Sequence, residues 1–199
     1  MSCAVLGRSL RHGVDALRHA SEHLDLGVAD RSVQALLDCR GRRYFTGIGK
    51  SGHAAARMAS SLSSIGLAAH WVHGAEWSHG ELGALGAGDL IFAVSQSGST
   101  QELVWLADHL RARKGAGVSM LSLTGDTGSP LALRSQLALT SAVPPELETL
   151  GALPTSSLLA QSAWSKCPPW QRPGSAPAPP LGALGGPMQL GAPRVGPGH

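Results

Sequence analysis

Two short loops in the sequence combine residue types that bind phosphate. The loop GIGKSG (47–52) places Lys50 between glycines, and the loop SQSGST (95–100) surrounds Gly98 with hydroxyl groups. Each loop precedes a stretch of helical pattern, and the free N–H groups at a helix N-terminus attract anions. Glycine also lets a ligand approach the backbone closely. The second loop therefore predicts a phosphate site formed by Ser95, Ser97, Gly98 and Thr100.

Neither loop matches a common nucleotide motif. GIGKSG lacks the Walker A spacing, and it lacks the acidic residue that follows a dinucleotide-binding GxGxxG loop. Two alternatives stay open on the residues alone. SQSGST also fits a serine-rich turn that caps a helix without any ligand, and Lys50 also fits a solvated surface charge.

The elements around these loops predict an α/β fold. Apolar strand patterns alternate with helical ones, which favours a parallel sheet covered on both faces. In such a sheet, ligands bind at the carboxyl ends of the strands, where both loops fall. Asp30 is predicted to cap the second helix. The strands are expected near 42–49, 68–73, 89–99, 117–125 and 136–143, and the helices near 4–25, 30–39, 51–66, 100–115 and 129–135.

The composition limits the class of protein. With 199 residues, 43% hydrophobic and only 4% aromatic, the chain fits one domain with an aliphatic core and an appendage. The basic excess lies entirely beyond position 161, in Lys166, Arg172 and Arg194, so we expect no nucleic-acid partner. We also expect no membrane partner and a cytoplasmic location, because no apolar run is long enough for a span and the cysteines have no disulfide or metal spacing. Arg8, Arg11 and Arg18 leave a mitochondrial presequence as the alternative.

The composition changes abruptly after Gln161. Residues 162–199 contain nine prolines and seven glycines, which predicts a disordered tail after a domain that spans 1–161. Trp164 and Trp170 are exceptions that either dock on the domain or face solvent.

Five motifs together resemble a known family. GIGKSG, VHGAEWSHGELG, AVSQSGSTQEL, LTG and LGALPTSS occur in the order and spacing of the sugar isomerase (SIS) domain. Within it, residues 10–161 look most like the arabinose-5-phosphate isomerases. The resemblance implies a five-stranded parallel sheet in a flavodoxin-like three-layer α/β sandwich, preceded by N-terminal helices. It also implies that the chain binds a phosphosugar and forms a homo-oligomer, a tetramer in the family.

The resemblance further implies the site residues. By position in the motifs, the catalytic candidates are Lys50, Glu102, Glu146 and His79. An aldose–ketose conversion moves a proton through an enediol, which needs a base and a group that neutralises the growing charge on oxygen. Glu146 or Glu102 would serve as the base. His79 would serve as a base, as the group that opens the sugar ring or as a zinc ligand, and Lys50 would neutralise the enediolate or the phosphate. The substrate-binding set adds Gly49, Ser51, Gln96, Thr155 and Ser156 to the phosphate loop.

No cofactor is expected to be required, although the family also places a divalent metal, zinc, at the position of His79. The residues alone give this metal little support. His53, His70, His73 and His79 lie near one end of two predicted strands, yet they show no HxxxH or HxH spacing.

The chain departs from the family after Gln161. A longer final helix and a later histidine of the family's active site have no counterpart, so apolar sheet surface is expected to be uncovered and assembly to be impaired. Three hypotheses follow. The chain is a sugar-phosphate isomerase domain, a phosphosugar-binding module without catalysis, or a truncated isoform without a stable fold.

Overall fold

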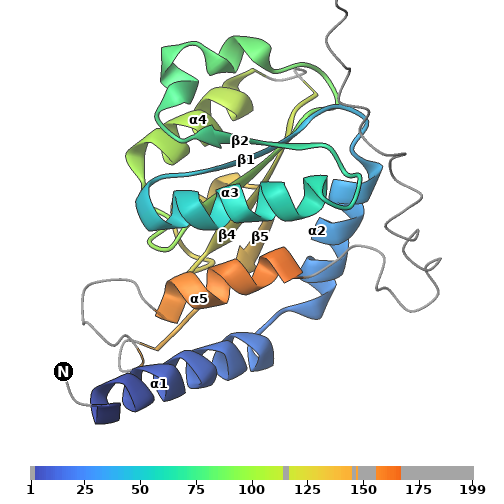
Figure 1. Cartoon of the computed structure of the whole chain (residues 1–199). Helices are drawn as coiled ribbons and strands as arrows, with labels where there is room; N and C mark the ends of the chain where they lie inside the picture. Colours follow the sequence, from blue (N-terminus) through green and yellow to red (C-terminus); the bar gives the residue numbers. More distant parts are fainter. Residues whose placement is uncertain (1–2, 114–116, 145–146, 148–155, 167–199) are drawn as a thin grey trace, which may run out of the picture. The chain divides into compact units, whose positions relative to one another are not determined.

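A computed structural model describes residues 3–113, 117–144, 147 and 156–166 of the chain (Figure 1). The chain divides into the units 1–169 and 170–199, and all described residues belong to the first. Within the part that the structure describes, no helix is long and apolar enough to cross a membrane.

A parallel sheet of five strands organises the described residues. The strands are β1 (Arg43–Gly47), β2 (Ala69–His73), β3 (Leu90–Ser95), β4 (Ser119–Thr124) and β5 (Leu137–Thr140). They lie in the order β2-β1-β3-β4-β5, and every pair is parallel. Gly47 pairs with Val94, and Ser95 pairs with Thr124, so the carboxyl ends of β1, β3 and β4 meet at one edge. This confirms the predicted sheet.

Helices cover both faces of the sheet, which confirms the three layers. On one face, α2 (Leu26–Asp38) and α3 (Gly49–Ser63) pack against β1, β3, β4 and β5 around Phe45 and Phe92. On the other face, α4 (Gln101–Ala112) packs with three short 3-10 helices, which are η1 (Glu76–His79), η2 (Glu81–Ala84) and η3 (Ala132–Arg134). The N-terminal helix α1 (Cys3–Glu22) packs along α5 (Ser156–Ala163).

The helix α2 begins earlier than predicted. Its N-cap is Asp25, whose Oδ1 accepts a hydrogen bond of 2.9 Å from the Val28 amide. Asp30 lies inside the helix, so its prediction as the cap is wrong. The physical reason is that Asp25 precedes a helix whose apolar face already includes Val28 and Ala29, which pack on the core.

The final helix covers more of the sheet than expected. It continues to Ala163, and the 3-10 helix η5 (Trp164–Lys166) follows it, so ordered structure passes the predicted boundary at Gln161. Trp164 is half-buried and packs against the core cluster that contains Leu121, Leu123 and Leu139. These leucines are buried, and the expectation of an uncovered apolar face is wrong for them. Trp170 and the rest of the predicted tail lie outside the described residues.

Candidate functional site

The first phosphate-type loop joins β1 to α3. Ile48 is the N-cap of α3 without a side-chain capping bond, and Gly49 has φ +58°, a backbone conformation that favours glycine. No atom lies within 4 Å of the place where a Cβ of Gly49 would project. Lys50 is exposed in the first turn of α3, and Ser51 beside it is half-buried. The loop therefore presents an open helix N-terminus that carries a cationic side chain.

The second loop is held together by its own hydroxyl groups. Ser95 is buried at the end of β3, and its Oγ lies 2.8 Å from Thr100 Oγ1 and accepts a hydrogen bond of 3.1 Å from the Gly98 amide. Thr100 is the N-cap of α4, but its side chain makes no capping bond. Ser97 is exposed, and its Oγ accepts from the Ser99 amide at 3.2 Å. Ser95 and Thr100 thus shape the loop, while Ser97 and the first residues of α4 are exposed to solvent.

A third segment, residues 129–131, packs against this loop. The sequence did not predict its part in the site. Gly98 has φ +60°, and a Cβ at this position would overlap the Oγ of Ser129. The Leu131 amide donates to the Gly98 carbonyl at 2.9 Å. Both Ser129 and Leu131 are buried. Only glycine fits at position 98, because both its conformation and its neighbour exclude a side chain.

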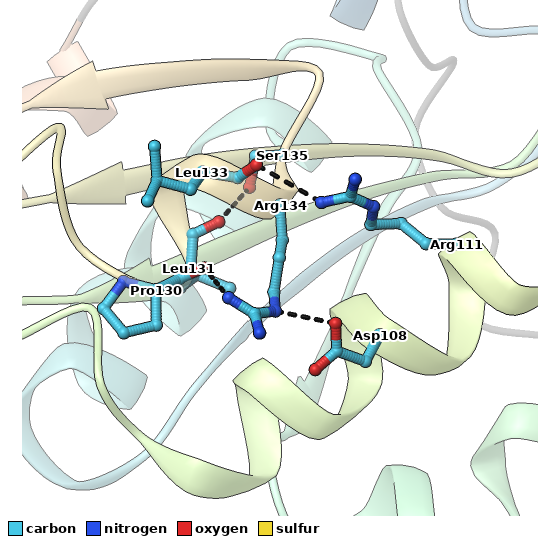
Figure 2. Close-up of polar contacts among 7 residues, drawn as sticks. All are labelled: Asp108, Arg111, Pro130, Leu131, Leu133, Arg134 and Ser135. Atoms are coloured by element: carbon cyan, nitrogen blue, oxygen red, sulfur yellow. Dashed lines mark hydrogen bonds and ion pairs between the residues drawn. The ribbon is translucent and has the colours of Figure 1, made fainter.

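This supporting segment is fixed to α4, as Figure 2 shows. Arg134 Nε donates to Asp108 Oδ1 at 2.7 Å, and Arg134 Nη1 donates to the Pro130 carbonyl at 2.9 Å. From the same helix, Arg111 Nη1 donates to the Leu133 carbonyl at 3.4 Å. These bonds hold residues 130–134 against α4, whose N-terminus follows the serine-rich loop.

A buried glutamine connects the two loops. Gln161 of α5 is 1% exposed. Its Oε1 accepts from Ser51 Oγ at 3.2 Å, and its Nε2 donates to Gln96 Oε1 at 2.8 Å. Sequence patterns gave no sign of Gln161 as a site residue, because its partners lie 110 and 65 residues away along the chain.

The predicted catalytic side chains follow three adjacent strands. Lys50 follows β1, Glu102 lies in the first turn of α4 after β3, and His79 ends η1 after β2. All three are exposed. Because carboxyl ends of parallel strands share one edge, the structure places these residues at the same edge as the two loops.

Of the three remaining predicted residues, the structure describes only Ser156, which lies at the start of α5. Ser156 is its first residue and is buried, and its Oγ donates to the Leu147 carbonyl at 2.7 Å. Glu146 and Thr155 lie outside the described residues.

Trp77 anchors the segment that carries His79. It is 1% exposed, and its Nε1 donates to Thr46 Oγ1 at 2.9 Å, so it packs in the core. Trp71 and Trp105 are 46% and 43% exposed.

The described side chains around His79 do not fit a metal site. Nowhere in the described ranges do three or more His, Cys, Asp or Glu side chains gather as ligands. His73 Nδ1 accepts from the Ala75 amide at 3.3 Å, so that nitrogen is already used. Zinc at His79 stays a prediction, and no step below involves it.

The fold and these loops define a parallel α/β domain with the N-termini of α3 and α4 at one sheet edge. Residues 36–165 match the SIS domain, and the chain therefore belongs to the SIS domain family.

Similar proteins share this assignment. The arabinose 5-phosphate isomerase KdsD of Pseudomonas aeruginosa is 39% identical over 143 residues, which cover 70% of this chain and 43% of that protein. The structure of E. coli CFT073 c3406 in complex with arabinose 5-phosphate has a TM-score of 0.76 and 26% identity, over 83% of this chain and 88% of that one. The Vibrio vulnificus NanR protein complexed with ManNAc-6P has a TM-score of 0.68 and 27% identity, over 79% and 58% of the two chains. The chain spans less than half the length of the curated relatives that it matches.

Proposed function

We propose that this domain binds a phosphosugar and interconverts an aldose and a ketose phosphate of the arabinose 5-phosphate and ribulose 5-phosphate type. The observation that carries the proposal is the serine-rich loop. Its internal bonds and its support by Ser129 and Leu131 hold the exposed Ser97 at the N-terminus of α4. A rigid cradle of hydroxyl and amide groups fits a phosphate dianion.

The exposed charges at the same edge would act at the sugar's carbonyl end. The reaction passes through an enediol, so a carboxylate or imidazole removes and returns one proton while a cation stabilises the oxyanion. Lys50 is the cation. Glu102, Glu146 and His79 are the candidate bases, and Glu102 also interacts favourably with the dipole of α4.

The comparisons support this substrate class. A relative named as an arabinose 5-phosphate isomerase matches most of this chain, and a protein of similar fold is seen with arabinose 5-phosphate bound. A homo-oligomer remains part of the proposal, as does a reaction without a required cofactor.

Conversion of arabinose 5-phosphate to ribulose 5-phosphate tests the proposal. Lys50→Ala should lower turnover by about 100-fold or more, because one preorganised charge on an oxyanion contributes roughly this factor. The melting temperature should stay unchanged, since Lys50 is exposed. Arg113→Ala is the matched control. Arg113 is an exposed cation at the C-terminal end of α4, and the serine-rich loop precedes the other end of that helix. Wild-type protein without turnover would refute an isomerase, and undiminished turnover of Lys50→Ala would refute the role given to Lys50.

A phosphosugar-binding module without catalysis is the second candidate. The similarity to the NanR protein in complex with ManNAc-6P favours it. Under this function, arabinose 5-phosphate raises the melting temperature without being converted. Combined Ser97→Ala and Thr100→Ala should abolish that stabilisation under either function, because the phosphate cradle is the same.

A further inference from the structure

Three side chains from distant parts of the chain form one hydrogen-bonded row. Ser51 belongs to α3, Gln96 to the serine-rich loop and Gln161 to α5. The row runs from Ser51 Oγ to Gln161 Oε1, and from Gln161 Nε2 to Gln96 Oε1. Ser51 and Gln96 are both predicted contacts of the phosphosugar, whereas Gln161 is buried behind them.

The direction of these bonds decides what each end of the row can offer a ligand. A primary amide has one accepting oxygen and one donating nitrogen. Gln96 Oε1 already accepts from Gln161, whereas the Gln96 NH₂ group, with its two protons, makes no bond within this row and can donate to a ligand. Ser51 has a single hydroxyl proton, which Gln161 Oε1 receives, so Ser51 keeps only lone pairs.

Gly125 keeps the Gln96 side chain in place. The Gly125 amide donates to the Gln96 carbonyl at 2.9 Å. A Cβ at Gly125 would overlap Gln96 Nε2, so the amide lies directly over this glycine. With one end held by Gln161 and the other packed on Gly125, the NH₂ group of Gln96 has a fixed position.

We propose that Gln161 is a positioning residue that makes Gln96 a hydrogen-bond donor and Ser51 an acceptor in the phosphosugar site. Gln96 then binds an acceptor of the substrate, a phosphate or carbonyl oxygen, and Ser51 binds a sugar hydroxyl. Turning the Gln96 amide alone would place its NH₂ group against the NH₂ group of Gln161, so Gln161 opposes that turn. This inference rests on the proposed function.

A double-mutant cycle tests the proposal on the full chain. Gln161→Met keeps the size of the side chain and removes both bonds, and calorimetric titration with arabinose 5-phosphate measures Kd. We expect Gln161→Met to raise Kd about 10-fold, the usual effect of losing one oriented hydrogen bond. In a chain that already carries Gln96→Met and Ser51→Ala, Gln161→Met should change Kd by less than about 2-fold. An equal increase in both backgrounds would mean general packing and would overturn the proposal.

Nuclear magnetic resonance on the wild-type protein gives a second test that needs no stable variant. The side-chain amide protons of Gln96 should shift and exchange more slowly with solvent when arabinose 5-phosphate is added, as required of a donor to the ligand. Unchanged Gln96 protons in a saturated complex would overturn the proposal. If wild-type protein does not bind arabinose 5-phosphate at all, the proposed function fails and takes the inference with it. Binding with an unaltered Kd in Gln161→Met removes the inference alone.

Discussion

Gly98 tolerates substitution least among the residues of the serine-rich loop. Its φ of +60° is costly for any other residue, and an added Cβ would overlap buried Ser129. We expect Gly98→Ala to destabilise the fold by about 1–3 kcal/mol and to weaken phosphosugar binding, because the backbone must leave its left-handed conformation. Thermal denaturation and titration with arabinose 5-phosphate measure the two effects.

Gly83→Ala is the control for this substitution. Gly83 lies in η2, and nothing is within 4 Å of its added Cβ. Its variant should melt and bind like the wild type. If Gly98→Ala behaves like Gly83→Ala, the loop is not the rigid cradle that the proposed function needs.

The residue types of the serine-rich loop suggested candidate contacts for a ligand. They did not show which distant residues hold this loop in place. The mixture of glycine and hydroxyl groups in SQSGST was enough to propose Ser97 and Gly98 as phosphate contacts, since these features lie within a few residues. Ser129 and Gln161 act only through contacts made by the folded chain, across 31 to 110 residues. Single-sequence patterns carry no signal for such contacts. The hydroxyl pattern also did not show that Ser95 and Thr100 bond each other.

At the scale of elements, strands were easier to place than helix ends. Four of the five strands have no more than one exposed side chain, and β3 in particular reads as an apolar run between polar loops. The start of α2 was misplaced because Asp25 and Asp30 both fit a capping pattern, and the structure has Asp25 as the N-cap, with its side chain bonded to the Val28 amide. The 3-10 helices η1 and η2 follow no hydrophobic period, so the segment around His79 could not be assigned in advance.

The two aspartates give a direct test of the start of α2. Asp25→Ala removes the bond to the Val28 amide and should lower the free energy of unfolding by about 1 kcal/mol, the usual value for an N-cap. Asp30→Ala removes no N-cap bond, because Asp30 lies inside the same helix, and it should lower the free energy of unfolding by less than Asp25→Ala. Chemical denaturation of both variants measures the difference. A larger loss for Asp30→Ala would place the cap where the sequence pattern first suggested.

At the scale of the whole described unit, one sheet serves both stability and function. Its carboxyl edge carries the two loops and the exposed charges, while its two faces carry separate apolar clusters. α5 connects these roles, because Gln161 reaches the site and the following Trp164 packs on the core cluster of the α2 and α3 face. A substitution at the end of α5 should therefore change the stability of the protein more than its turnover.

Trp164→Ala tests whether Trp164, directly after α5, covers apolar surface that a longer final helix was expected to cover. The half-buried indole contacts the cluster around Phe92 and Leu139, so its loss should destabilise the protein by about 1–3 kcal/mol, less than the cost of a fully buried tryptophan. Trp105→Ala, which removes an indole that is 43% exposed, should cost under about 1 kcal/mol. Melting curves of the full chain compare the two. Equal, small losses would mean that α2 and α3 hold this face without Trp164, and that residues 164–166 contribute nothing to the stability of the sheet.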